Sequence, residues 1–209
     1  MDDRQRCMPY AKRGRSPAEE VTADQLAGGG RDHCRRLVER DESLLMASTR
    51  RKHVKYEEGQ WFGVPLRDGG YAIGTIVRGS YRTRGGLGYF FGPRYDRPPG
   101  DEVTQHLQAM NAILVGFFGD LGIIEGRWPL IASSRPFRRD EWQVPKLGRL
   151  DPVVPTRGVL VEYDQEDDGS RRQLRLSSCS AEELVGLPQD GLYGAGAIEI
   201  ALTKLLGKG

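Results

Sequence analysis

Two acidic residues lie close together in a segment that otherwise consists mostly of glycine and apolar residues. Asp120 and Glu125 belong to the sequence GDLGIIEGRWP, one residue after Gly119 and one residue before Gly126. A pair of carboxylates can act as general acid and general base, so Asp120 and Glu125 are the candidate catalytic residues of a small hydrolase. The alternative, which we favour, is a charged turn between strands in which Glu125 simply pairs with Arg127.

Few other residues could complete a catalytic set. His106 is the only histidine after residue 58, and the pattern places it on a helix over residues 101–111, beside an apolar stripe. Cys179 would be its partner in a Cys–His nucleophile pair, but nothing in the sequence brings the two side chains together. We therefore interpret both as structural residues.

Metal and cofactor signals are equally sparse. Cys7 and Cys34 lack the paired C-x-x-C spacing of zinc sites, and we predict no metal there. Asp140 and Glu141 could join the two candidate carboxylates around a cation, but no spacing demands it. The sequence therefore predicts no metal and no cofactor.

Charge distribution argues against nucleic acid as the main partner. Residues 1–58 contain 13 basic and 11 acidic residues, whereas residues 59–209 contain 18 of each. Non-specific binding of nucleic acid needs a cluster of uncompensated cations, which a balanced domain does not offer. The segment RGSYRTR (78–84) leaves an RNA-binding module as a further alternative, because its Arg and Tyr side chains could stack on bases; a solvated hairpin loop is the favoured interpretation.

No run of apolar residues is long enough to span a membrane, and no secretory signal is visible at Met1. We therefore predict a cytoplasmic protein that has no membrane partner.

A protein partner is the other option. Trp, Tyr and Arg dominate the residues that contribute most to binding energy at protein interfaces, although most of the aromatic residues should also serve the core. The predicted partner-binding residues are Trp61, Tyr89, Arg94, Asp120, Glu125, Arg127 and Trp128.

The strongest structural signal lies at residues 57–93. Residues 60–66 and 71–77 alternate in the manner of strands, and the Asp-Gly-Gly turn that joins them is typical of a hairpin. A glycine- and arginine-rich connection over 78–88 leads to a third apolar strand at 89–91. Glycines inside hairpin-linked strands indicate a bent sheet.

The rest of the chain predicts further strands and short helices. Residues 112–118 are nearly continuously apolar, which indicates a strand covered on both faces. The remaining predicted elements are strand pieces at 123–124 and 128–132, a loop at 133–156, a hairpin of 158–163 with 171–176, a short helix after Ser180, and a helix at 198–206. The predicted fold is α+β: a mostly antiparallel, strongly bent β-sheet or small barrel with two or three helices packed at one side.

The N-terminal residues differ from this pattern. Residues 1–45 contain few large apolar residues and cannot bury enough apolar area to offset the entropy of ordering. We predict a disordered extension over 1–57, with Met46 as an alternative start, and a folded domain over 58–209.

Four segments carry a family resemblance: EGQWFGVPLRDGGYAIGTIVRG (58–79), LGYFFGPR (87–94), FGDLGIIEGRWPLI (118–131) and GLPQDGLYGAGAIEIALTKLL (186–206). They resemble the immunity protein 26 family of bacterial polymorphic-toxin systems over residues 58–206. The resemblance implies a small cytoplasmic protein that binds and neutralises a cognate toxin without catalysis. Relatives of the domain have also been labelled phosphotriesterase-like, but this chain lacks the histidine- and carboxylate-rich pattern of two-metal hydrolysis.

Overall fold

The computed structural model describes residues 54–207, which lie within one compact unit, Arg50–Gly209. The predictions for residues 1–45, Cys7, Cys34 and Met46 therefore fall outside the described residues.

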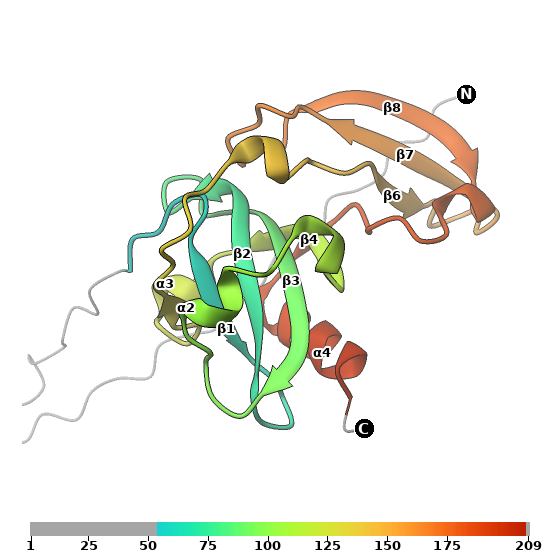
Figure 1. The fold of residues 1–209 in the computed structure, drawn as a ribbon. Helices are drawn as coiled ribbons and strands as arrows, with labels where there is room; N and C mark the ends of the chain where they lie inside the picture. The colour runs from blue at the N-terminus through green and yellow to red at the C-terminus, as the bar shows by residue number, and fades with distance from the viewer. Residues whose placement is uncertain (1–53, 208–209) are drawn as a thin grey trace, which may run out of the picture. The chain divides into compact units, whose positions relative to one another are not determined.

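Strands dominate this part of the chain, and within it they form two sheets (Figure 1). The six-stranded sheet has the order β5-β1-β2-β3-β4-β9, and its strands are β1 (Trp61–Pro65), β2 (Tyr71–Ser80), β3 (Gly85–Tyr95), β4 (Leu114–Gly119), β5 (Leu130–Ile131) and β9 (Leu192–Tyr193). The three-stranded sheet is built from β6 (Leu147–Leu150), β7 (Arg157–Tyr163) and β8 (Gln173–Ser180) in sequence order.

Short helices join and cover these strands. The described residues form the α-helices α2 (Asp101–Thr104), α3 (Leu121–Ile124) and α4 (Ala195–Leu205), and the 3-10 helices η1 (Ala109–Asn111), η2 (Arg139–Glu141) and η3 (Glu182–Leu184). All strand pairs are antiparallel except β4 with β9. The predicted α+β class with mostly antiparallel strands is thus confirmed, and the larger sheet is open, with the two-residue strands β5 and β9 at its edges.

Each face of the six-stranded sheet packs against its own apolar cluster. The first cluster contains Tyr56, Phe62, Val64, Leu66, Ala72, Ile76, Phe90, Phe118, Ile123, Trp128, Ala195, Ile198 and Leu202. The second contains Trp61, Ile73, Val77, Leu87, Tyr89, Phe91, Phe117, Ile131, Trp142, Val144, Leu147, Val161 and Tyr163. Helices α3 and α4 therefore pack on one face, and the smaller sheet packs on the other. The predicted alternation of faces along the first two strands is confirmed.

Strand β4 also follows its prediction. Phe118 and the half-buried Leu114 pack in the first cluster, whereas Phe117 and Val115 pack in the second. Successive side chains of a strand point to opposite faces, so a continuously apolar strand must have apolar neighbours on both sides.

The predicted helix over residues 101–111 is wrong beyond Thr104, where α2 ends. Val103, Leu107 and Met110 would form one apolar stripe if the helix ran to residue 111. Val103 and Leu107 do pack against the second cluster, but Met110 is 84% exposed. The chain turns through η1 instead and enters β4.

Residues Ile123 and Ile124 form part of helix α3 and not the predicted strand piece. Asp120 precedes the helix, and its carbonyl oxygen accepts hydrogen bonds from the amides of Ile123 (2.8 Å) and Ile124 (3.0 Å). A short apolar run cannot by itself distinguish a strand from a buried helical turn.

The predicted connection over residues 78–88 is much shorter in the structure. Strand β2 continues to Ser80 and β3 begins at Gly85. The two strands approach so closely that a Cβ atom at Gly86 would lie 1.8 Å from the carbonyl oxygen of Arg78. The glycine run therefore serves close backbone contact.

The C-terminal half contains two strands that were not predicted: β6, inside the predicted loop over 133–156, and the two-residue strand β9. The predicted hairpin is confirmed as β7 and β8. The predicted short helix after Ser180 is η3, and Ser180 and Glu183 bond to each other at its start. The Ser180 amide donates to Oε2 of Glu183 at 2.8 Å, and the Glu183 amide donates to Oγ of Ser180 at 3.3 Å.

Candidate functional site

The three aromatic residues predicted to contact a partner lie in the core. Trp61, Tyr89 and Trp128 are all buried. The Trp128 ring stacks on Phe62 with centroids 5.5 Å apart, and Trp61 packs edge-on against Trp142 at 5.9 Å. Their large apolar area is used for folding, so they form no exposed surface in this structure.

Asp120 is buried and makes a specific contact. Its Oδ2 accepts a hydrogen bond of 2.7 Å from the Tyr56 hydroxyl. Burial, followed by the hydrogen bond and negative charge of Asp120, raises the pKa of the Tyr56 hydroxyl. Tyr56 therefore stays protonated and fixes the carboxylate beside the start of α3.

Glu125 lies at the other end of α3 and has a different partner. Its Oε2 accepts a hydrogen bond of 2.9 Å from Nε of Arg127, as the charged-turn interpretation predicts. No contact joins Glu125 to Asp120 among residues 54–207, and no group of three or more metal-binding side chains is present in that range. Asp140 pairs with Arg138 at 2.7 Å, and Glu141 pairs with Arg135.

The remaining predicted residues occupy separate positions. Arg94 on β3 donates from one nitrogen to both carboxylate oxygens of Asp68, at 2.7 and 2.9 Å. His106 is exposed and Cys179 is half-buried, and no interaction between them is present in the described part of the chain.

A buried carboxylate that sequence reasoning did not identify is Glu199 on α4. Its oxygens contact Nη1 of Arg127 at 2.9 Å, the indole nitrogen of Trp128 at 3.0 Å and Nη2 of Arg67 at 2.9 Å. These bonds connect α4 to the β1–β2 turn and to the residues that precede β5. The sequence offered one signal for this role: Glu199 directly follows Ile198, a buried apolar residue of α4.

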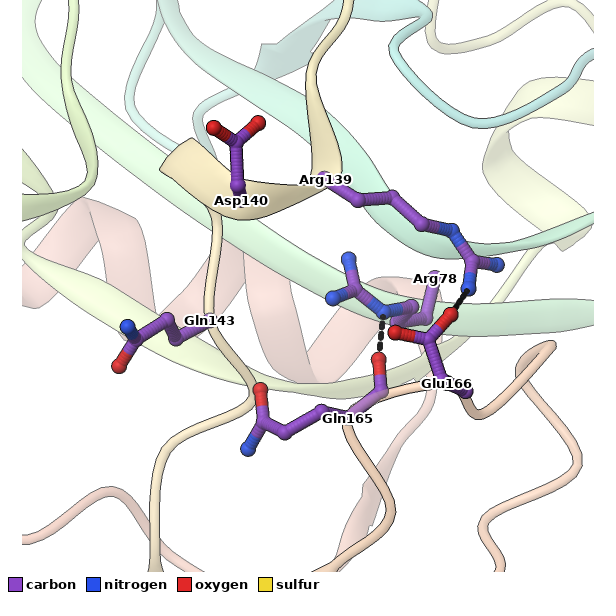
Figure 2. Close-up of a pocket in the computed structure, with 6 residues that line it drawn as sticks. All are labelled: Arg78, Arg139, Asp140, Gln143, Gln165 and Glu166. Atoms are coloured by element: carbon purple, nitrogen blue, oxygen red, sulfur yellow. Dashed lines mark hydrogen bonds and ion pairs between the residues drawn. The ribbon is translucent and has the colours of Figure 1, made fainter.

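A second feature missed from the sequence is a pocket of about 660 Å³, which we call the arginine pocket (Figure 2). Three separated parts of the chain contribute to it: the end of β2, the η2 segment, and the loop between β7 and β8. Its lining residues are Arg78, Arg139, Asp140, Gln143, Gln165 and Glu166.

Arg78 forms the buried base of this pocket, with 2% of its surface exposed. Its Nε donates to the carbonyl oxygen of Gln165 at 2.9 Å, and its Nη1 donates to the carbonyl oxygen of Val77 at 2.7 Å. Burial, followed by the positive charge of Arg139, lowers the pKa of the Arg78 guanidinium. Arg78 lies in the segment RGSYRTR (78–84), for which the sequence favours a solvated hairpin loop, so neither its burial nor a pocket beside it was predicted.

Arg139 has every nitrogen engaged. It binds both carboxylate oxygens of Glu58, at 2.8 and 2.7 Å, and one oxygen of Glu166 at 3.0 Å. Its Nη2 also lies 3.4 Å from the carbonyl oxygen of Asp167. Arg139 therefore connects the N-terminal side of β1 to the β7–β8 loop. Contacts within residues 54–207 use four of its five N–H groups, which leaves one N–H on Nη1 for a ligand.

Two further contacts hold the pocket walls. The Tyr89 hydroxyl donates to the carbonyl oxygen of Gln143 at 2.6 Å, and burial raises the pKa of this hydroxyl to about 12. The side chain of Gln165 makes two hydrogen bonds of 2.8 Å with the backbone of Val144. The pocket is thus fixed before anything binds.

A second cavity, of about 640 Å³, lies beside Asp120 and has a largely apolar lining. It is lined by Val54, Lys55, Tyr81, Arg84, Gly119, Asp120, Leu121 and Ile124. Of the arginines in the RNA-binding alternative, Arg82 and Arg84 are exposed, whereas Arg78 is buried. The segment therefore cannot present all three arginines to one ligand.

Comparison with known proteins identifies one family. Residues 57–158 match the model of the family described as Immunity protein 26, which confirms the resemblance. The match covers β1 to β6 and ends at the start of β7. No curated protein and no solved structure matches the chain. No helix of residues 54–207 has both the length and the apolar character needed to cross a membrane.

Proposed function

Because residues 57–158 belong to the Immunity protein 26 family, we propose that the chain is a cytoplasmic immunity protein that binds a cognate protein toxin and blocks it without catalysis. The family match is the observation that carries this proposal. The contacts of the two candidate catalytic carboxylates agree with it, because Asp120 is held by Tyr56 and Glu125 by Arg127. Both acids have structural partners.

The exposed part of the predicted partner-binding set supplies the proposed contact residues. Arg127 has about half of its side chain exposed, as does Glu125 beside it. Arg67 is similarly exposed and shares Glu199 with Arg127. An arginine whose guanidinium is already oriented by a buried carboxylate loses less entropy on binding, so Arg67 and Arg127 suit an interface.

The direct test uses a toxin encoded beside this chain in its genome. Cells that produce the toxin domain should grow when the chain is co-produced, and the two purified proteins should form a complex in isothermal titration calorimetry. Absence of both protection and complex formation would contradict the proposal.

The same system separates binding from catalysis. The double variant Asp120→Asn, Glu125→Gln keeps the shape of both side chains, and we expect it to weaken toxin binding by at most about 1–2 kcal/mol. Protection should then persist at higher protein concentration. A matched control is Glu182→Gln, which neutralises an exposed carboxylate on η3.

One outcome would favour the hydrolase alternative. If the double variant binds the toxin as tightly as the parent but no longer protects cells, while Glu182→Gln protects normally, protection requires chemistry.

A further inference from the structure

Arg78 is a buried cation that forms no ion pair with the carboxylates closest to it, Glu58 and Glu166. Its guanidinium has five N–H groups, of which one on Nε and one on Nη1 donate to backbone carbonyl oxygens. No ion pair joins Arg78 to a carboxylate within residues 54–207. Glu58 and Glu166 are bonded to Arg139 and act on Arg78 only through space. A buried charge that lacks a directly bonded counter-charge is costly, so the unused edge of this guanidinium favours an anion.

The unused edge faces the cavity. Figure 2 shows the terminal nitrogens of Arg78 pointing into the arginine pocket, away from the carbonyl oxygen of Gln165. In the same view the carboxylate of Asp140 points away from Arg78. The remaining N–H groups on Nη1 and Nη2 form a planar fork, which matches two oxygens of one anion.

The surroundings of the fork limit which anion fits. Arg139, the other guanidinium of the pocket, is already bonded to Glu58 and Glu166. One free fork with the Glu166 carboxylate nearby disfavours a dianion, which would need several donors. We propose that the arginine pocket binds a single carboxylate group, held by the outer edge of the Arg78 guanidinium.

The pocket is well prepared for this role. The guanidinium is fixed by two carbonyl oxygens, and the walls are fixed by the Tyr89–Gln143 and Gln165–Val144 bonds. Binding therefore costs little ordering of the protein. The carboxylate can come from a small acid or from an acidic side chain of a bound protein.

The test titrates the full chain, without a toxin, and follows backbone amides by NMR. The probes are sodium acetate, a capped tripeptide with a central glutamate, its glutamine analogue, and sodium phosphate, all at matched ionic strength. We expect saturable shifts centred on Gln143, Gln165 and Glu166 for at least one carboxylate probe, with a dissociation constant of about 1 mM. The glutamine analogue should give none.

Acetate binding alone indicates a small acid as the source, and binding of the glutamate peptide alone indicates an acidic side chain. Two variants test the residue itself. Arg78→Lys keeps the charge but removes the fork, so binding should weaken by about tenfold or more. Arg175→Gln removes an exposed arginine on β8 and should leave binding unchanged.

The proposal is overturned if no carboxylate probe saturates, if the shifts lie away from the pocket, or if phosphate binds as tightly as the carboxylates. It is also overturned if Arg78→Lys binds as well as the parent. If Arg78→Lys does not fold, the titration of the unmodified chain still tests the first three outcomes: saturation, the location of the shifts and the preference over phosphate. A negative titration would not affect the test of toxin protection, so this proposal and the proposed function can be refuted independently.

Discussion

The two sheets of this protein bury their strands to very different extents. In β2 every residue between the two terminal positions is buried, whereas no residue of β8 is buried. The larger sheet has an apolar cluster on each face. The smaller sheet contributes Leu147, Val161 and Tyr163 to one of these clusters and leaves its outer strand exposed. The two sheets are therefore stabilised by different means.

Buried carboxylates replace apolar packing at the ends of the smaller sheet. Asp167 accepts hydrogen bonds from the amides of Gly169, Arg171 and Arg172 and from the Ser170 hydroxyl. Asp190 accepts a hydrogen bond of 2.6 Å from the Tyr163 hydroxyl. A carboxylate that accepts several backbone N–H bonds orders a loop that lacks a core of its own.

The largest effect is expected at Phe117, where the two sheets meet. Its ring is buried in the second cluster, 4.8 Å between centroids from Tyr163 of β7. Phe117→Ala should lower the free energy of unfolding by about 3–5 kcal/mol through lost burial and a residual cavity. Urea denaturation measures this change. Leu114→Ala, at a half-buried position on the other face, should lower the free energy of unfolding by less. A decrease below about 1 kcal/mol for Phe117→Ala would contradict the assignment of the core.

A smaller effect is expected at Asp167. Asp167→Ala leaves four donors of the β7–β8 loop without their acceptor, which should cost about 2 kcal/mol. Hydrogen exchange of residues 164–172 should become faster. Asp168→Ala is the matched control, because Asp168 is exposed in the same loop. Equal effects of the two variants would show that the loop is not organised by the buried carboxylate.

Leu176 on β8 should matter least for packing. It lies opposite Val161 in the register but is 54% exposed. Leu176→Ala should change the free energy of unfolding by about 0.5 kcal/mol or less. A loss comparable to that of Phe117→Ala would mean that the smaller sheet has a second covered face, and the contrast between the sheets would disappear.

The last prediction concerns a contact outside both sheets. Hydrogen bonds from the hydroxyl and the amide of Ser134 lower the pKa of the Asp101 carboxyl to about 2. A lowered folded-state pKa stabilises the protein above the unfolded-state pKa of about 4, and this contribution is lost as the pH falls through about 2. The melting temperature of the parent should therefore exceed that of Asp101→Asn by a constant amount above about pH 4, and the gap should close towards pH 2. A gap that does not depend on pH would contradict the assignment.

Much of the larger sheet follows from the sequence, because each side chain along β1, β2 and β4 has its face fixed by a period of two. Phe117 and Phe118 could be assigned to opposite faces for this reason. Helix α3 and strand β6 could not be predicted. Helix α3 depends on the capping carbonyl of Asp120, and β6 is a four-residue strand whose partner β7 begins after a further loop.

The candidate site was less predictable than the fold. Glu125 and Arg127 are neighbours in the chain, so their ion pair could be anticipated. The arginine pocket unites Arg78, Arg139 and Gln165, which are far apart in sequence. Only the packing of the smaller sheet on the larger one brings them together, and no local pattern records that contact.

The close approach of β2 and β3 restricts which residues can evolve at position 86. Since the carbonyl oxygen of Arg78 occupies the space that a Cβ atom would need, even alanine would push the Arg78 backbone outward. A library of all substitutions at this position should therefore be depleted of every residue except glycine. The place of the Arg78 side chain on β2 therefore depends on Gly86 of β3, a residue that has no side chain of its own.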